Sequence, residues 1–179
     1  MLDYYKNRYL KHSWVDPRIE VRTSAVEGKG LFAKEVIKKG EVIEIFGGEI
    51  FTVEEEAQGK MRIHTGINVD DGLYLGLPVD SIEESIDEFT NHSCDPSCWL
   101  VDEVTLVTRR DINSGEEITM DYGTWYVEEG DIWITNCACR TKLCRHTVTG
   151  DDWKRKDLQQ RYKGHFSPFI ERMIAKLEG

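Results

Sequence analysis

The chain has 179 residues, 40% hydrophobic and 31% charged, and its 33 acidic residues outnumber 23 basic ones to give a net charge of −10. This composition predicts one soluble globular domain of ordinary size with a small appendage. No apolar stretch approaches the roughly 18 residues that a membrane span needs, so no membrane association is expected. The acidic balance argues against direct nucleic-acid binding, which depends on basic contacts to phosphates, and favours a basic partner.

The first part of the chain reads as short strands separated by an insert. After an N-terminal flank over residues 1–18, residues 19–50 alternate short apolar runs with glycines, which is typical of β-strands and tight turns. A second β-rich block covers residues 99–120, with a turn at Ser114-Gly115. Between the blocks, the insert over residues 52–90 looks less regular, and we expect one helical turn near "SIEESIDEF".

The C-terminal residues are predicted to be helical. Two stretches, "DDWKRKDLQQRY" and "SPFIERMIAKLEG", carry helical patterns. In the second, Ser167 is the expected N-cap and Pro168 the first helical residue. Its apolar residues share one face: Phe169, Ile170, Met173, Ile174 and Leu177.

The five cysteines suggest a reducing compartment and a metal site. Their number is odd, and the N-terminus lacks the apolar stretch of a secretory signal. We therefore expect an intracellular protein, nuclear or cytoplasmic, whose thiols bind metal instead of forming disulfides.

Three of these cysteines have the spacing C-x-C-x4-C: Cys137, Cys139 and Cys144. A structural zinc ion takes four ligands, so a fourth must come from elsewhere. His146 is too close to Cys144, and Cys98 begins a strand pattern, where a buried free thiol is common. Cys94 lies in the polar loop "TNHSCDPSC" and is the better candidate for a site with one zinc ion. The alternative interpretation is that the three cysteines of the tail are unrelated thiols that bind no metal. Three basic residues interleave the cysteines and would offset the charge of the thiolates: Arg140, Lys142 and Arg145.

Several stretches gain meaning in combination. "GKGLFA" alone is typical of a turn and lacks the pattern of a phosphate loop. Followed by "IFGGEI", "FTNHSCDPSC", "GEEITMDYG" and the tail cysteines, it resembles the SET-domain family of protein lysine methyltransferases with a post-SET zinc module.

The resemblance covers about residues 19–149 and implies a mainly β architecture. The fold expected is the β-clip, with a knot-like threading of the C-terminal segments and helices after the zinc module. The implied division is an N-terminal flank (1–18), a SET domain (19–124) with an insert (about 52–90), a post-SET zinc module (125–149) and a C-terminal helical extension (150–179). In the family, the cysteine of "NHSC" completes the zinc site, in agreement with Cys94.

The same resemblance implies an enzyme that transfers a methyl group from S-adenosylmethionine to a lysine of a protein. A histone tail is one candidate substrate, and a bacterial or cytosolic protein is equally defensible. Tyr122 matches the catalytic tyrosine. The implied cofactor contacts are Glu27, Gly28, Lys29, Gly30, Leu31, Asn91, His92, Arg140 and Val148. On residue chemistry alone, Asn91 could be a turn residue and His92 a satisfied buried histidine.

Three positions depart from the family pattern. Phe46 and Met120 stand in the lysine channel where many members carry residues with hydroxyl groups, and neither can hydrogen-bond an amine. We therefore expect di- or trimethylation. Glu88 stands where many members carry an arginine, and no reason for it is evident from the sequence. The rival interpretation is a catalytically silent SET-like module that binds a peptide or scaffolds a complex.

Overall fold

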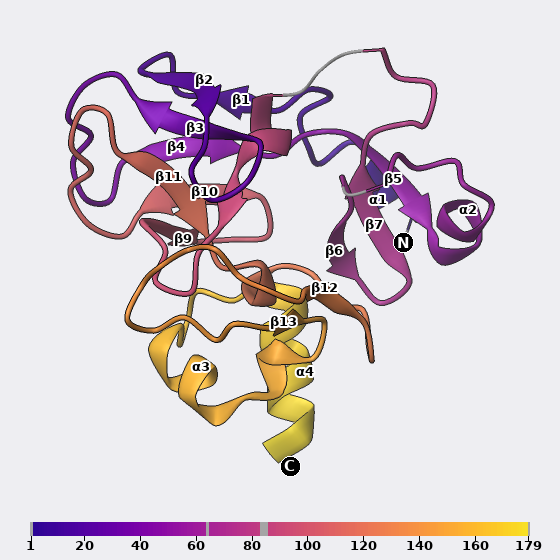
Figure 1. Ribbon diagram of the computed structural model, residues 1–179. Coiled ribbons are helices and arrows are strands. Elements are labelled where there is room, and N and C mark those ends of the chain that lie inside the picture. The colour runs from indigo at the N-terminus through magenta and orange to yellow at the C-terminus, as the bar shows by residue number, and fades with distance from the viewer. Residues whose placement is uncertain (1, 64, 83–85, 179) are drawn as a thin grey trace.

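The computed structural model describes residues 2–63, 65–82 and 86–178 (Figure 1). Its elements form a strand-rich body of two four-stranded sheets, a separate three-stranded insert sheet, and a C-terminal part with helices. The insert sheet lies to one side of the body, and the C-terminal part lies beneath the body (Figure 1). The fold is mainly β, as predicted.

The strand-rich body contains both predicted β blocks. The first sheet has the order β1-β4-β10-β9: β1 (Trp14–Val15), β4 (Val42–Ile45), β10 (Thr105–Thr108) and β9 (Cys98–Leu100). The second has the order β2-β3-β11-β8: β2 (Ile19–Thr23), β3 (Lys29–Ala33), β11 (Glu117–Met120) and β8 (Asn91–His92). Leu31, Ile43 and Leu106 are fully buried in the shared apolar core.

One pairing in this body brings two motifs together. β11 pairs in parallel with β8, so that Thr119 lies opposite Asn91 and Met120 opposite His92. The segments "NHSC" and "DYG" are therefore adjacent, although about thirty residues separate them. The knot-like threading of these segments and the predicted domain boundaries stay predictions.

The insert is more regular than the sequence suggested. β5 (Glu49–Thr52), β7 (Leu73–Gly76) and β6 (Ile67–Asp70) form an antiparallel sheet in that order, and α2 (Val53–Ala57) follows β5. The hairpin between β6 and β7 turns at Asp71-Gly72, where Gly72 has a φ of 67° that glycine adopts without strain. α1 (Leu2–Lys6) lies beside this sheet, and the Tyr5 hydroxyl donates to Asp70 over 2.7 Å. The predicted helical turn corresponds to the 3-10 helix η1 (Ile86–Phe89); Glu83, Glu84 and Ser85 of that prediction lie outside the described residues.

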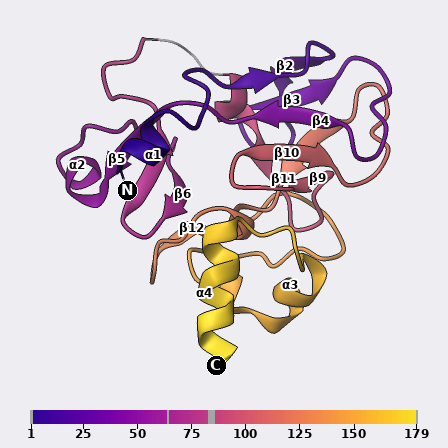
Figure 2. The same cartoon turned by 180° about the vertical axis from the view of Figure 1, so that it is seen from behind.

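The C-terminal part departs from the predicted helices at one point. Its elements are η2 (Tyr122–Thr124), β12 (Ile132–Ile134), β13 (Val148–Thr149), η3 (Asp152–Lys154), α3 (Lys156–Arg161) and α4 (Pro168–Glu178). The first predicted helix is interrupted at Arg155, whose extended backbone, with ψ of 125°, separates η3 from α3. The second begins as predicted, with Ser167 Oγ accepting from the amide of Ile170. Leu177, near the end of α4, is 58% exposed because this end extends away from the body (Figure 2).

Across the described residues, no helix combines the length and apolar character that crossing a bilayer requires.

Candidate active site and metal centre

Four cysteine thiols converge below the body. Four Sγ atoms lie within 4.8 Å of one another, those of Cys94, Cys137, Cys139 and Cys144. Cys94 follows β8, while the other three lie in the loop between β12 and β13. A tetrahedral zinc ion, with Zn–S bonds of about 2.3 Å, separates its sulfurs by about 3.8 Å, and the Cys94 and Cys137 sulfurs are 3.9 Å apart. The donor set therefore fits one zinc ion, and Cys94 is the fourth member of the cluster.

The other two candidates for a fourth ligand lie apart from these sulfurs. Cys98 is fully buried at the start of β9 and belongs to the apolar core, which confirms its predicted place. His146 contributes its main-chain carbonyl, which accepts from the amide of Cys137 over 2.7 Å.

Hydrogen-bond donors surround the cluster. The amide of Arg145 donates to Cys94 Sγ over 3.3 Å, and His92 Nε2 lies 3.3 Å from the same sulfur. Burial alone would raise the pKa of Cys139, but hydrogen bonds from Thr141 outweigh it and lower the pKa to about 6. Such donors favour the thiolate form that binds metal, whereas burial outweighs them at two other members, raising the pKa of Cys94 and raising that of Cys137 to about 11.

The side chain of Arg145 makes a buried network next to the sulfurs. Its guanidinium bonds Asp121 twice, over 2.6 and 2.8 Å, and Asp152 over 2.9 Å. All three side chains are at least 94% buried. Asp121 directly precedes Tyr122, so this network links the cysteine cluster to the predicted catalytic residue.

The glycine loop, residues 24–30 between β2 and the first residues of β3, is tied to β8 by Asn91. Its amide nitrogen lies 3.2 Å from the carbonyl of Glu27, 2.9 Å from that of Lys29 and 2.8 Å from Glu117 Oε1. Gly30 is required here, since an added Cβ would lie 2.3 Å from Glu117 Oε1. Asn91 is thus a strand residue that holds the loop, and the turn interpretation was wrong.

Glu117 is a site residue that the sequence reasoning missed. The same oxygen that accepts from Asn91 also accepts from the hydroxyl of Ser24, over 2.7 Å. The carboxylate therefore joins the start of the glycine loop to β11 directly, and the end of the loop through Asn91. Its signal was a charged residue inside an apolar strand pattern next to "DYG".

The ring of His92 is buried, and each of its two nitrogens has a polar neighbour. Nδ1 accepts from the amide of Tyr122 over 3.3 Å, so the ring proton belongs on Nε2, which faces Cys94 Sγ. Burial lowers the pKa of His92 to about 4, and the ring is neutral at pH 7. The satisfied-histidine interpretation describes this side chain, and any cofactor contact of His92 would use its main chain.

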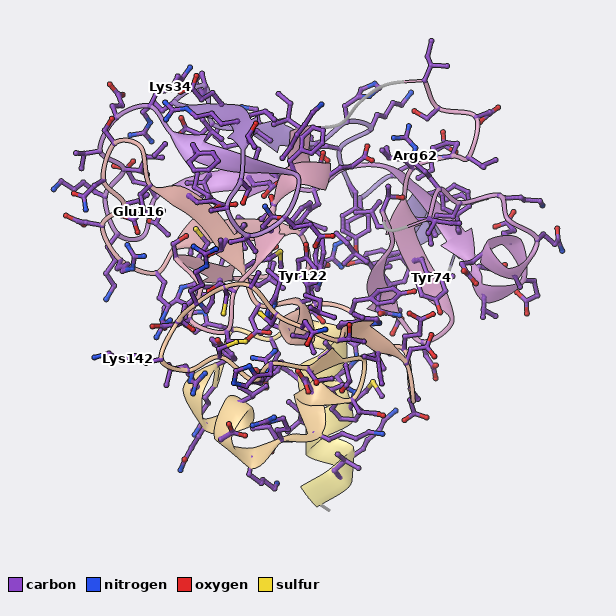
Figure 3. All side chains as sticks on the ribbon, in the orientation of Figure 1. Lys34, Arg62, Tyr74, Glu116, Tyr122 and Lys142 are labelled. Carbon is purple, nitrogen blue, oxygen red and sulfur yellow. The ribbon has the colours of Figure 1, made fainter. Side chains whose placement is uncertain are left out.

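Tyr122 begins η2 directly after β11 and lies where the body, the insert sheet and the C-terminal part meet (Figure 3). Its hydroxyl donates to the carbonyl of Thr90 over 3.1 Å. Burial, followed by the charge of Glu27, raises the pKa of Tyr122 to about 12. The phenol therefore stays protonated at neutral pH and acts as a hydrogen-bond donor.

The predicted channel residues share one apolar cluster with Tyr122. Phe46 and Met120 are 3% and 1% exposed, and the ring of Trp125 packs 4.9 Å from that of Phe46 and 6.2 Å from that of Tyr122. Trp125 was missed; its signal was an aromatic residue three positions after the predicted catalytic tyrosine. A cavity of about 20 Å³ opens beside these rings, lined by Phe46, Gly47, Thr65, Ile67, Leu77, Asp87, Glu88 and Trp125.

Comparison with known protein families identifies this arrangement. The family model described as "SET domain" matches residues 28–123, more than half of the chain. The chain belongs to the SET domain family.

Curated relatives agree with the SET assignment. The chain is 32% identical over 165 residues to "Histone-lysine N-methyltransferase ash1" of Drosophila melanogaster, an alignment covering 86% of this chain and 7% of that protein. It is 32% identical over 145 residues to "Histone-lysine N-methyltransferase set1" of Dictyostelium discoideum, covering 73% and 9%. A human "Histone-lysine N-methyltransferase, H3 lysine-36 specific" is 30% identical over 72% of this chain and 5% of its own length. The chain thus spans less than a tenth of each relative.

A solved structure supports the SET fold. The methyltransferase domain of human "Histone-lysine N-methyltransferase SETMAR" superposes with a TM-score of 0.58 at 19% identity, covering 73% of this chain and 57% of that one.

Two of the cofactor-contact residues implied by the SET resemblance lie outside the glycine loop and β8. Val148 is fully buried in β13, opposite Ile134 of β12. Arg140 is exposed, with a φ of 55°. Their place beside the glycine loop stays a prediction. Glu88, unexplained from the sequence, pairs with Arg62 over 2.7 Å beside the small cavity.

Proposed function

We propose that this SET domain transfers a methyl group from S-adenosylmethionine to the ε-amine of a protein lysine. The observation that carries the proposal is the pairing of β8 with β11, which sets Tyr122 beside Asn91 and the glycine loop that Asn91 holds. These are the motifs by which the chain resembles methyltransferases of its family.

The cofactor would lie against main-chain atoms of Glu27 to Leu31 and of Asn91 and His92. S-adenosylmethionine, when bound, supplies a methyl group on a positively charged sulfur. Asn91 of β8 and Glu117 of β11 would keep the loop in shape for it, since Asn91 bonds two carbonyls of the loop and Glu117 accepts from Ser24. The cysteine cluster, with one zinc ion, would fix the segment that carries Arg140 and Val148.

Tyr122 would orient the reaction through the lone pairs of its hydroxyl oxygen, since the hydroxyl proton is donated to the Thr90 carbonyl. A hydroxyl with a pKa of about 12 is a poor base at neutral pH, and its bond to the Thr90 carbonyl sets its direction. The lysine amine must lose its proton before it reacts, because only its lone pair can attack. A free lysine has a pKa of about 10.4, and burial among Phe46, Met120 and Trp125 would lower it.

The small cavity at Phe46 and Trp125 is the proposed entry for the lysine. At about 20 Å³ it has room for one water molecule, so a lysine side chain requires Trp125 and the insert to move apart. The carboxylates of Asp87 and Glu88 at the cavity would attract the cationic amine from solvent.

We propose a histone as the substrate and an intracellular location. The net charge of −10 suits a basic protein, and the relatives are histone-lysine methyltransferases by name. Because neither Phe46 nor Met120 carries a hydroxyl that could hold the amine in one orientation, a methylated amine can turn for a second transfer. Di- or trimethyl-lysine is the expected product.

The test is transfer of isotopically labelled methyl from S-adenosylmethionine to recombinant histone H3 and to a proteome extract, with sites assigned by mass spectrometry. Labelled lysine carrying two or three methyl groups supports the proposal, and Met120→Tyr should shift the product toward one methyl. A product that stops at monomethyl-lysine contradicts the proposed degree. Cofactor binding by calorimetry without transfer to any protein favours the silent module.

A further inference from the structure

Two consecutive residues at the end of α3 reach back to the active site. Arg161 Nη1 donates to the carbonyl of Cys94 over 3.1 Å. The hydroxyl of Tyr162 lies 3.0 Å from Asp121 Oδ2 and 3.5 Å from the Cys94 carbonyl. Its single proton serves the shorter contact to the charged acceptor. The C-terminal extension thus touches the residue before Tyr122 and the residue that completes the cysteine cluster.

Asp121 controls how the chain enters the turn that carries Tyr122. Its Oδ1 accepts from the amide of Gly123 over 3.1 Å and so caps η2. Arg145 holds both oxygens of the same carboxylate, and the amide of Arg145 donates to Cys94 Sγ. The orientation of Asp121 is therefore set by donors from two segments that follow the predicted SET domain.

Water cannot replace the hydroxyl of Tyr162 in this place. Tyr162 is fully buried and Asp121 is 1% exposed. The Tyr162 hydroxyl is therefore enclosed together with the carboxylate that it bonds. Removing it would leave a buried carboxylate one donor short, and the carboxylate would turn to regain a partner.

We propose that Tyr162 is a positioning residue for methyl transfer, which acts through Asp121 on Tyr122 and makes α3 part of the active site. Tyr162 touches neither substrate nor cofactor in this proposal. The inference rests on the proposed function, because methyl transfer is one of its two readouts.

Tyr162→Phe tests the hydroxyl alone, because the ring keeps its place edge-on to Phe166, with centroids 6.1 Å apart. We expect kcat for histone H3 to fall about tenfold, which corresponds to about 1.4 kcal/mol in the barrier. The KM values for S-adenosylmethionine and histone should stay within about twofold, and zinc content should stay at one ion per chain. Fluorometric kinetics and elemental analysis supply these numbers.

Phe166→Leu is the matched control. Phe166 is 4% exposed in the same apolar cluster, and its apolar side chain cannot bond Asp121. It should lower the melting temperature at least as much as Tyr162→Phe while kcat stays within about twofold. If both variants lower kcat equally, or if Tyr162→Phe keeps the wild-type kcat, Tyr162 has only a structural role and the proposal is wrong.

Zinc release gives a readout that needs no methyl transfer. Since Asp121 and Arg145 connect Tyr162 to Cys94, Tyr162→Phe should release zinc to a chromophoric chelator about threefold faster than wild type, and Phe166→Leu should not. A wild-type chain without transferase activity would contradict the proposed function. The coupling would then be judged by zinc release alone, and equal rates in wild type and Tyr162→Phe would overturn it.

Discussion

The strand-rich body and the C-terminal part are stabilised by different forces. In the body, fully buried apolar side chains such as Leu31, Ile43 and Leu106 pack between the two sheets. The C-terminal part has a smaller apolar cluster around Trp153 and Tyr162. It adds to this the cysteine cluster and the buried network centred on Arg145.

This difference matters because the candidate active site lies at the boundary. Apolar packing tolerates substitutions that conserve volume, whereas a buried polar network requires every partner. Tyr122 leaves the body at the end of β11 and is fixed from below by Asp121. Its geometry should therefore depend more on the polar contacts of the C-terminal part than on the size of the apolar core.

The largest expected effect separates the two parts. Cys94→Ser should abolish stoichiometric zinc binding and open residues 125–149 to protease while the body resists, because structural zinc contributes about 10 kcal/mol or more to folding in small zinc peptides. Elemental analysis and limited proteolysis measure both. Cys98→Ser is the control, since Cys98 lies in the apolar core, and it should keep its zinc. Zinc retained by the Cys94 variant and lost by the Cys98 variant would reverse the assignment.

The second effect concerns the boundary itself. Tyr122→Phe should lower turnover at least about 100-fold, since a fixed polar group aimed at the reacting atoms contributes about that much. Cofactor affinity by calorimetry should change little. Tyr9→Phe, which removes a hydroxyl that donates to Glu103, should leave turnover within about twofold. Near-normal turnover of the Tyr122 variant would remove this residue from the mechanism.

The third prediction compares a buried ion pair with an exposed one. Arg145→Met should lower the free energy of unfolding by about 3–5 kcal/mol, because Asp121 and Asp152 would be left buried without their cation. Arg22→Met, which removes an exposed pair with Glu20, should cost less than about 1 kcal/mol. Denaturant titration measures the free energy of unfolding of both variants. Similar losses of free energy would show that burial of the network does not add to its contribution to stability.

The smallest effect comes from a polar exception inside the body. Glu44 is fully buried, accepts from the Thr90 hydroxyl over 3.0 Å, and has no partner for Oε1 among the described residues. Burial, followed by the charge of Asp87, raises the pKa of Glu44 well above 4.5. Above pH 4.5 the unfolded chain releases this proton while the folded chain keeps it. Stability is therefore lost as the pH rises toward the folded pKa, with a slope of up to about 1.4 kcal/mol per pH unit.

Glu44→Gln should remove this slope and stabilise the protein at pH 8, as measured by denaturant titration between pH 5 and 8. Glu35→Gln, at an exposed position, should leave the pH dependence unchanged. A Glu44→Gln variant less stable than wild type at pH 8 would contradict the assignment of a buried neutral carboxyl.

Local patterns in the sequence were enough for some features. The spacing of three cysteines and the polar loop of Cys94 predicted the cluster, because ligand number and chain reach are local constraints. The N-cap at Ser167 was also readable. The insert sheet was missed, although Asp71-Gly72 between two apolar runs is a hairpin signal, because four-residue strands carry little periodicity.

By itself, the sequence determined the mainly β character, the cysteine set and the motifs by which the chain belongs to its family, since each depends on residue type and spacing along the chain. Tertiary structure decided that Asn91 and Glu117 hold the glycine loop, that Trp125 lines the cavity, and that Tyr162 and Arg145 meet at Asp121. These contacts join residues from 24 to 93 positions apart. The sequence alone does not say which acidic residue pairs with Arg145. Asp121 is selected as the partner only by the packing that excludes water from its carboxylate.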